Sequence, residues 1–272
     1  MSNTVKAYQD KIIRFGEYPQ TIKTDNVDIT STMDARGYYL GSDGAYYAKV
    51  IATPHEDDYT FSNGEYVRKG ETYYFKVEPI SWQTLSEESG VSLVLCDSII
   101  ANRRYATNSN NYAESEIRAW LNNEFYRTAF DSLQQSMIEV TEVDNSARST
   151  NPDGNPTQWN NGENEYACQN TIEKIFLLSE REVTMVDYGF SSYDDYGATN
   201  ARRRQACDYA RATGIWLSTE PSDYYNGWWW LRSPTYRGCD LVRVVNDDGY
   251  VRTNSNVYHN DGGVVPAMRI RL

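Results

Sequence analysis

Hydrophobic and polar residues alternate along much of the first half of the chain. Four segments carry this pattern and are rich in Tyr, Val and Phe: residues 37–41, 45–52, 71–80 and 91–98. Aromatic and β-branched side chains suit a pleated, half-buried surface. The first half of the chain is therefore predicted to be largely β-sheet.

The hydrophobic period changes to that of an amphipathic helix after residue 114. In the stretch ESEIRAWLNNEFYRTAF, bulky apolar residues recur close to the i, i+3, i+4, i+8 spacing. Ser115 is a suitable N-cap for this segment. A helix is predicted here, with a buried stripe made by Ile117, Trp120, Leu121 and Phe125.

A second helix is predicted at about residues 200–213, where Gly214 supplies the stop signal. The basic run 202–204 is expected on the solvated face of that helix rather than in a nucleic-acid patch. Between the two helices, the apolar run 175–178 predicts a buried strand, followed by a short helical turn.

The polar stretch 144–170 is longer than ordinary connections between elements. It is expected to be a loop that packs over the core and is held there by Trp159. No internal repeat or linker is visible. The organisation predicted is a short N-terminal tail, residues 1–9, followed by one domain over residues 10–272.

The C-terminal third begins with the apolar stretch NGWWWLRSP, which predicts a central strand. Because side chains alternate across a strand, Trp228 and Trp230 should face one way and Trp229 the other. Further on, Asp248 and Gly249 lie between two alternating runs and predict a tight hairpin turn. Two glycines then lead into a closing strand over residues 264–272.

The second arm of this hairpin has two different faces. The residues on one face are Tyr250, Arg252, Asn254, Asn256 and Tyr258, and those on the other are Val251, Thr253, Ser255 and Val257. Tyr, Arg and Asn supply rigid aromatic area and adaptable hydrogen bonds in recognition surfaces. Two interpretations stay open: a binding face and an ordinary solvated hairpin.

Residues 233–267 contain no Glu, Lys, Gln, Met or Trp, although 44 of the first 232 residues are of these five types. At that frequency the absence of all five over such a length has a chance of roughly one in a thousand. A restriction on residue type therefore operates in this segment, and its origin can be structural, functional or genetic.

Composition narrows the function classes. With 40% hydrophobic residues, the 272-residue chain can bury a core, and its net charge of -12 argues against a nucleic-acid partner. No apolar run of membrane-spanning length and no signal sequence are visible, so synthesis in the cytoplasm is expected, with display on a phage particle left open.

Metal and cofactor chemistry finds little support in the residue counts. The chain has two histidines and four cysteines, and the cysteines show no CxxC spacing. Free thiols are expected. A zinc or iron site built on imidazole is not expected, and no cofactor is predicted.

Five motifs give the chain a resemblance to a known family. FGEYPQT, SEIRAWLNNEFYRTAF, KIFLLS, WWLRSP and GVVPAMRI follow one another over nearly the whole chain. Together they resemble a bacterial domain family of unknown function that also occurs in phages. Its members resemble the C-type lectin fold. The resemblance implies an α+β protein with mixed, mostly antiparallel sheets, two main helices and long loops.

Some members of that family are the variable proteins of diversity-generating retroelements, in which an error-prone reverse transcriptase alters adenines in a C-terminal cassette. An AAC or AAT codon that is rewritten in this way keeps its terminal pyrimidine and cannot encode Glu, Lys, Gln, Met or Trp. This is the set missing from residues 233–267. The resemblance therefore implies a ligand-binding protein rather than an enzyme, diversified at about residues 233–262.

The partner implied by the resemblance is a protein or carbohydrate target that the sequence cannot identify, with no membrane insertion. The diversified, ligand-contacting positions that it implies are Tyr236, Arg237, Asp240, Arg243, Asn246, Asp247, Tyr250, Arg252, Asn254, Asn256, Tyr258, His259 and Asn260. The rigid scaffold that it implies is Trp229, Trp230, Leu231, Arg232 and Ser233. Arg232 is expected to pair with a carboxylate inside the protein.

Other chemistry remains as alternatives. The same general fold houses formylglycine-generating enzymes, for which Cys207 and Cys239 could be proposed, although nothing that flanks them resembles that active site. A calcium-dependent lectin could use residues 246–248 as oxygen ligands, but a turn explains them more simply. Neither histidine lies near a GxSxG-like nucleophile elbow. A structural or adhesion module of a phage or cell surface is the remaining class.

Overall fold

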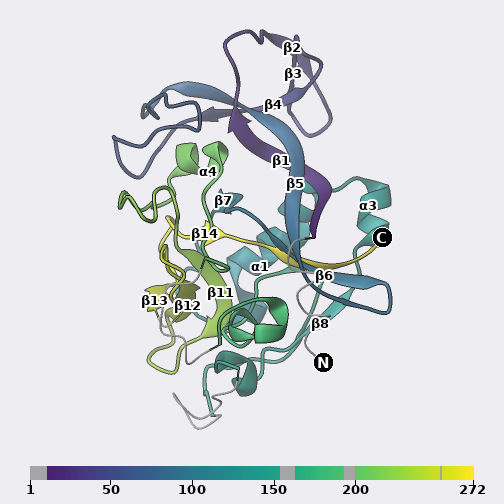
Figure 1. Ribbon diagram of the computed structural model, residues 1–272, viewed down its shortest axis with the longest axis vertical. Helices are drawn as coiled ribbons and strands as arrows, with labels where there is room; N and C mark the ends of the chain where they lie inside the picture. The colour runs from purple at the N-terminus through teal and green to yellow at the C-terminus, as the bar shows by residue number, and fades with distance from the viewer. Residues whose placement is uncertain (1–10, 154–162, 193–199, 252) are drawn as a thin grey trace.

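The computed structural model describes residues 11–153, 163–192, 200–251 and 253–272, and two β-sheets form its framework (Figure 1). The larger sheet has the strand order β10-β15-β6-β5-β4-β3-β2, with β1 paired antiparallel along β5. Its eight strands are β1 (Ile12–Ile22), β2 (Ile29–Met33), β3 (Tyr39–Gly41), β4 (Tyr46–Ile51), β5 (Thr72–Glu88), β6 (Val91–Cys96), β10 (Ile175–Phe176) and β15 (Ala267–Arg271).

The smaller sheet has five strands in the order β13-β12-β11-β14-β7. β11 pairs antiparallel with β12 and parallel with β14, so this sheet is mixed. Its strands are β7 (Ala101–Asn102), β11 (Trp229–Pro234), β12 (Leu241–Val245), β13 (Thr253–Asn256) and β14 (Gly263–Val264), and a separate pair is formed by β8 (Thr141–Val143) and β9 (Thr171–Glu173). The predicted α+β class with mostly antiparallel sheets is confirmed.

The predicted helix after residue 114 is confirmed. α1 (Glu116–Trp120), a π-helical turn η3 (Leu121–Phe125) and α2 (Tyr126–Ala129) follow one another without a break. The Ser115 hydroxyl accepts a hydrogen bond from the Arg118 N–H at 3.3 Å and so caps the start. The shorter helical elements are η2 (Tyr112–Glu114), α3 (Ser132–Met137), η4 (Ala147–Thr150), η5 (Glu182–Thr184) and η6 (Val186–Tyr188).

The predicted helix over 200–213 is wrong for its first half. Only α4 (Asp208–Thr213) is helical, and it ends at Gly214 with φ 109° as the stop signal predicted. The run 202–204 does not lie on a solvated helix face, because Arg202 is 1% and Arg204 4% exposed. Both guanidinium groups donate hydrogen bonds to backbone carbonyls inside the protein, so a segment that looks surface-exposed in sequence is held in the core.

The N-terminal strands β1 and β2 were not predicted. β1 pairs with β5, whose residues lie about 60 positions further along the chain, and its register shifts between Arg14 and Glu17 and between Pro19 and Ile22. A register shift changes which side chains face the core. The burial pattern of β1 therefore does not alternate simply.

The long loop is packed over the body where it is described. Ser149 and Thr150 of η4 and Asn151, which follows it, are buried. Trp159, proposed to hold this loop, and the proposed tail 1–9 lie outside the described residues.

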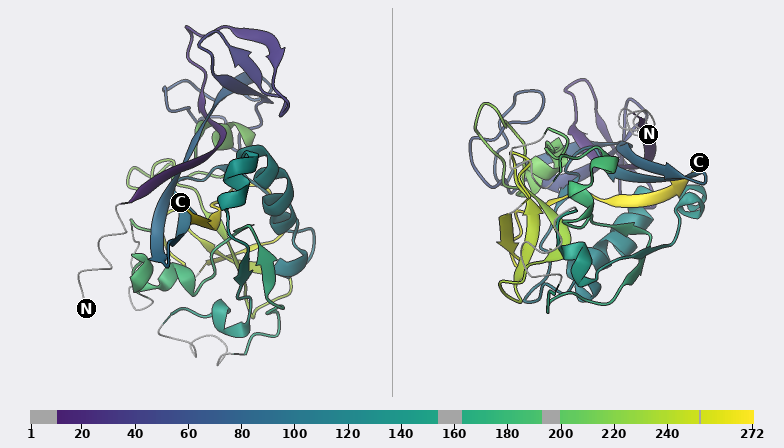
Figure 2. Two further views of the ribbon diagram at one scale, coloured as in Figure 1. Left: turned by 90° about the vertical axis from the view of Figure 1, so that its right-hand side faces the viewer. Right: turned by 60° about the horizontal axis from the view of Figure 1, so that its bottom comes forward.

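The two sheets share one core and occupy different parts of the molecule. A single cluster of buried side chains includes Trp82 of the larger sheet and Trp229 and Trp230 of the smaller one. β2, β3 and β4 extend above the body, and the β12–β13 hairpin lies at its edge, opposite α3 (Figures 1 and 2). The hairpin is thus placed at the periphery of a well-packed body.

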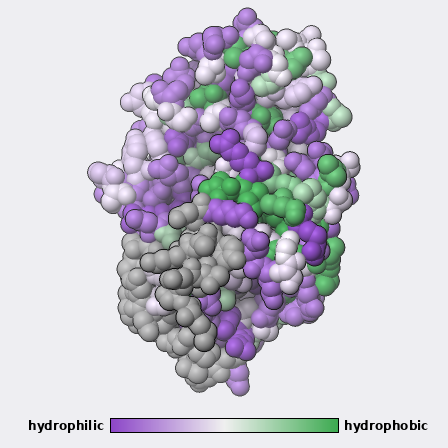
Figure 3. All heavy atoms as spheres, turned by 45° about the vertical axis from the view of Figure 1, so that its right-hand side comes forward, coloured by the Kyte–Doolittle hydropathy of each residue, from purple (hydrophilic) through white to green (hydrophobic). Residues whose placement is uncertain are grey.

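Hydrophilic residues cover most of the described surface on the face shown in Figure 3, with hydrophobic residues gathered in a band across its middle. This matches the mean hydropathy of -0.70. No helix in the described ranges is long and apolar enough to cross a membrane.

Candidate ligand-binding surface

β11 is the strand that carries the predicted scaffold residues, and each of its six residues is buried. The rings of Trp228 and Trp230 lie 4.8 Å apart on one side of the strand. Trp229 lies on the other side and donates its indole N–H to the Arg202 carbonyl at 3.1 Å. The Trp230 indole donates to the Arg103 carbonyl at 2.8 Å. The alternation predicted for the three tryptophans is therefore confirmed, and both polar indole groups are satisfied.

Arg232 makes the buried ion pair that the sequence led us to expect, and its partner is Glu182. The guanidinium also donates to the Leu177 carbonyl at 2.7 Å and to the Asp144 carbonyl at 3.1 Å. Burial alone would lower the pKa of Arg232, but the neighbouring Glu182 carboxylate outweighs burial and raises the pKa above its usual value. Arg232 therefore stays charged and joins β11 to the residue that follows β8 and to the segment from the end of β10 to the start of η5.

A second buried ion pair corrects one of the predicted ligand contacts. Arg243 on β12 is 3% exposed, and its Nε donates to Glu180 Oε2 at 3.0 Å. Arg243 was predicted on the ligand-contacting face, but the Glu180 segment covers its side of β12 and keeps it from solvent. The backbone N–H of Glu180 donates to Ser233 Oγ at 2.9 Å, so Ser233 belongs to the same buried scaffold.

The hairpin turn forms where the Asp248–Gly249 pair predicted it. The N–H of Asn246 donates to the Tyr250 carbonyl at 2.8 Å, and Gly249 takes a positive φ of 85°. Asp248 Oδ1 accepts from the Tyr250 N–H at 2.9 Å. These carboxylate and amide groups therefore build the turn. The second strand begins at Thr253 rather than at Tyr250.

The loop between β11 and β12 is fixed by Asn110, which the sequence gave no reason to single out. Asn110 is buried, and its Nδ2 donates to the carbonyls of Gly238 and Leu241 at 2.8 and 3.0 Å. Its N–H donates to the Cys239 carbonyl at 2.7 Å. Because Asn110 lies more than a hundred residues before the loop, no local pattern could have indicated this support.

Most of the remaining predicted contact residues reach the surface. Arg237, Tyr258 and Asn260 are exposed, and those that are partly exposed are Tyr236, Asp240, Asn246, Asp247, Tyr250, Asn254, Asn256 and His259. Val251 and Val257, predicted on the opposite face, are buried. Arg252 lies outside the described residues. The polar residues of the hairpin and of the loop before β12 therefore lie over a buried scaffold, and we call the eleven residues named above the hairpin face.

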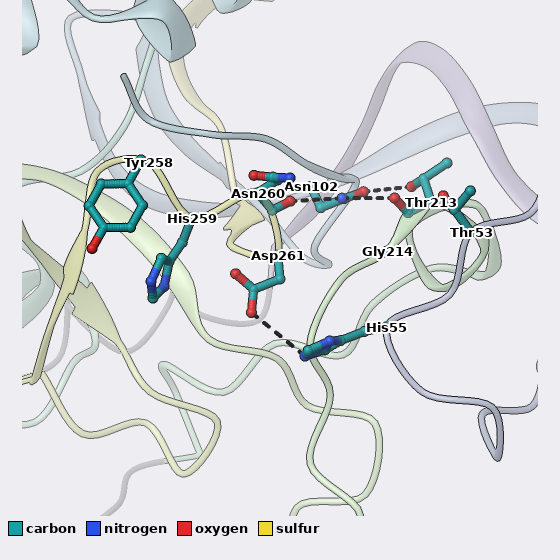
Figure 4. A pocket seen from close by; sticks show the side chains of 9 residues that line it. All are labelled: Thr53, His55, Asn102, Thr213, Gly214, Tyr258, His259, Asn260 and Asp261. Carbon is teal, nitrogen blue, oxygen red and sulfur yellow. Dashed lines mark hydrogen bonds and ion pairs between the residues drawn. The ribbon is translucent and has the colours of Figure 1, made fainter. Parts of the chain in front are cut away.

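A pocket of about 520 Å³ adjoins the end of the hairpin face. Residues 258–261 form one wall, and Thr53, His55, Asn102, Thr213 and Gly214 form the rest (Figure 4). His55 and His259 are the only histidines of the chain, and both line this pocket. The sequence could not bring them together, because they lie about two hundred positions apart.

The described part of the structure gives little support for an enzyme active site built on cysteine or for a metal site. Burial raises the pKa of the Cys207 thiol to about 12, whereas Cys239 is exposed in the loop before β12. All four cysteines are free, as predicted. In the ranges that the structure describes, no group of three or more His, Cys, Asp and Glu side chains is arranged to hold a metal ion.

Comparisons with known proteins identify the family of the chain. No curated protein and no solved structure matches it. The model of one protein family matches residues 89–272, which include β6 to β15, the hairpin face and the buried scaffold. β1 to β5 and the pocket residues Thr53 and His55 precede that match. The chain belongs to the family described as Domain of unknown function (DUF6273).

Proposed function

We propose that this protein is a ligand-binding, receptor-like protein whose hairpin face is diversified by retroelement-directed adenine mutagenesis. The observation that carries the proposal is the absence of Glu, Lys, Gln, Met and Trp from residues 233–267. Rewriting the adenines of AAC and AAT codons cannot produce these five types.

The positions of the residues support this proposal. A surface that accepts many sequences must lie on a scaffold that does not depend on them, because core substitutions commonly cost several kcal/mol and surface ones about 0.5 kcal/mol or less. Here the hairpin face is solvent-accessible, while Trp229 and Trp230 beneath it are fully buried. The buried Arg232–Glu182 pair and Asn110 hold the surrounding segments in place. A rigid platform also limits the conformational entropy lost on binding.

The fold we propose is C-type-lectin-like. The α+β class and the mostly antiparallel sheets are compatible with it. The targets we propose are proteins or carbohydrates outside the chain, reached on a phage particle or a cell surface. We do not propose an enzymatic activity.

The alternative is a structural or adhesion module whose hairpin is a solvated edge. A formylglycine-generating-type enzyme is less well supported, because the thiol of Cys207 is held in its protonated form by burial. An undiversified module would show the same fold with an invariant hairpin. The two functions therefore differ in the genetics of the hairpin and in its tolerance of substitution.

The experiment that tests the proposal is deep sequencing of the C-terminal coding region and its flanking DNA in the source population. We expect substitutions concentrated at adenines in the codons of the hairpin face, beside a near-identical template repeat and a reverse transcriptase gene. A uniform pattern dominated by silent changes, with no template repeat, would overturn the proposal and favour the structural module.

A further inference from the structure

The pocket beside the hairpin face is built from four segments that hydrogen bonds tie together. Asn102 on β7 donates from Nδ2 to the carbonyls of Thr213 and Asn260, both at 3.0 Å. The Thr213 hydroxyl donates to Asn102 Oδ1 at 2.6 Å. The N–H of Thr53 donates to the Ala212 carbonyl at 2.7 Å. These contacts fix the walls of the pocket and leave its interior open (Figure 4).

Gly214 keeps the pocket open at its back wall. Its φ of 109° lies in the left-handed region, and a Cβ at this position would meet the Thr53 carbonyl oxygen at 3.0 Å. The chain therefore reverses tightly at the end of α4 and brings Thr53 and His55 beside residues 258–261. A larger residue at 214 would separate the two walls.

The side chains that face the open space are Asp261 and the two imidazoles. Figure 4 shows the Asp261 carboxylate between the rings of His55 and His259. His55 Nε2 lies 3.8 Å from Asp261 Oδ2, which is longer than a hydrogen bond. Both side chains are about 30% exposed. The carboxylate therefore keeps hydrogen-bonding capacity for a ligand, and His259, whose Nδ1 contacts Ser255 Oγ, keeps its Nε2.

The lining chemistry selects among ligand classes. Among the described residues that line the pocket there is no Lys or Arg, and Asp261 is their one carboxylate, so a phosphate or carboxylate ligand would meet a negative charge without a fixed cation from these residues. In the described part of the lining, the Tyr258 ring is the one large apolar group, so a lipid would find little apolar contact there.

We infer that this pocket binds a saccharide. Sugar hydroxyls donate and accept hydrogen bonds, which matches an accepting carboxylate beside imidazole and amide groups. The half-exposed Tyr258 ring at the rim offers an apolar face for the sugar ring. A volume of about 520 Å³ is sufficient for a mono- or disaccharide.

This inference rests in part on the proposed function, because Tyr258, His259 and Asn260 belong to the hairpin face. Asn102 and Gly214 lie outside the diversified stretch 233–262, and Asp261 lies within it but is not one of the hairpin-face positions, so we propose that these three residues are the constant part of the pocket. Thr53 and His55 precede the part of the chain that matches the family, residues 89–272. The hydroxyl-binding chemistry would therefore be constant, and the diversified residues would select the sugar or the linkage.

The test is titration of the full chain with the methyl glycosides of glucose, galactose, mannose and N-acetylglucosamine, followed by ligand-observed and amide-detected NMR. At least one glycoside should bind at concentrations up to about 10 mM and shift the amide signals of Gly214 and Asp261. Asp261→Asn should weaken that binding about ten-fold, because it removes the charged acceptor. The matched control is Asp58→Asn, which removes the same charge from an exposed carboxylate outside the pocket.

Two results would overturn the inference: no binding by any of the four glycosides, or equal affinities for Asp261→Asn and Asp58→Asn. If Asp261→Asn lowers the melting temperature, His55→Gln provides the same comparison from the opposite wall. The proposed function is judged separately, by the adenine-directed substitutions in the population. Loss of sugar binding therefore leaves diversification standing, and an invariant cassette leaves the sugar site standing.

Discussion

Arg243 donates from Nε to Glu180 Oε2 at 3.0 Å beneath the hairpin, in an ion pair whose side chains are 3% and 0% exposed. Arg243 lies opposite Asn254 in the β12–β13 register, and its ion pair links β12 to the segment between β10 and η5. An arginine within the restricted stretch 233–267 is thereby part of the scaffold. This relationship divides the stretch into residues that can vary and residues that cannot.

Arg243→Met should destabilise the protein by about 3–5 kcal/mol, because it removes a buried cation that pairs with the buried Glu180 carboxylate. Arg237→Met removes the same charge from an exposed position nearby and should change stability by less than about 0.5 kcal/mol. Urea unfolding followed by tryptophan fluorescence measures both. Similar losses in the free energy of unfolding for the two variants would show that the buried ion pair contributes no more to stability than the exposed arginine.

Alanine at Tyr250, Asn254 or Tyr258 should leave the melting temperature within a few degrees of wild type, because these side chains are at least partly solvent-exposed. If the hairpin face binds a target, the same variants should lose affinity, with the largest loss of about 2 kcal/mol or more at a tyrosine. Calorimetric melting and surface plasmon resonance with a captured target separate the two effects. Unchanged affinity for all three variants would favour the structural module.

Gly262→Ala should destabilise the protein by about 1–3 kcal/mol through overpacking. A Cβ at this position would come within 2.5 Å of the Trp228 ring and as close to the Trp230 indole. Gly238→Ala is the control, because there the nearest atom is the movable Asp240 carboxylate at 3.1 Å. Thermal unfolding of the two variants tests this. A larger loss for Gly238→Ala would contradict the packing argument.

Native labelling with iodoacetamide at pH 8 should modify Cys239 first. Burial raises the pKa of Cys96 to about 11 and that of Cys207 to about 12, so neither forms appreciable thiolate at this pH. Burial also raises the pKa of Cys168. Mass spectrometry of the digested protein locates the label, and unfolding in guanidinium before labelling should equalise all four sites. Rapid labelling of Cys207 in the native state would contradict this expectation and favour a catalytic role for its thiol.

Sequence predicted those features that depend on neighbouring residues. The hairpin turn follows from Asp248 and Gly249, the helix start from Ser115, and the opposite directions of Trp229 and Trp230 from strand alternation. Each of these depends on a period or on a cap within a few residues. The buried Arg232 pair was also expected, but its partner Glu182 could not be named, because no local pattern connects the two.

The predictions that were wrong, and the features that were missed, concern contacts between distant segments of the chain. Arg202 and Arg204 were predicted on a solvated helix face. Instead, Arg202 Nε donates to the Gly249 carbonyl at 2.8 Å, and Arg204 Nε donates to the Cys96 carbonyl at 3.1 Å. Such bonds satisfy a buried guanidinium without leaving a local signal. Arg243 was assigned to the surface because Glu180, which covers it, lies about sixty residues earlier. The same reason explains why Asn110 and the His55–Asp261 pocket were missed.

Glu116 should make the stability of the protein depend on pH in the acid range. Hydrogen bonds from the Thr107 hydroxyl and the Arg104 guanidinium lower the pKa of this carboxyl from its ordinary value of 4.5. A carboxyl whose pKa is lower in the folded state binds fewer protons there than in the unfolded chain. Its contribution is therefore complete above pH 4.5 and is lost as the pH falls through the folded-state pKa.

The measurement is the melting temperature of wild type and Glu116→Gln across that range. At pH 7 the variant should be less stable by up to about 1 kcal/mol, because the side chain is partly exposed and solvent screens the pair. As the pH falls through the folded-state pKa of Glu116 the two melting temperatures should approach each other, since the wild-type carboxyl becomes protonated. Glu124→Gln is the control, because Glu124 pairs with Arg103 from a more exposed position and should show a smaller difference at pH 7. A gap between wild type and Glu116→Gln that stays the same as the pH is lowered below 4.5 until the protein unfolds would mean that the Glu116 contribution does not depend on its charge.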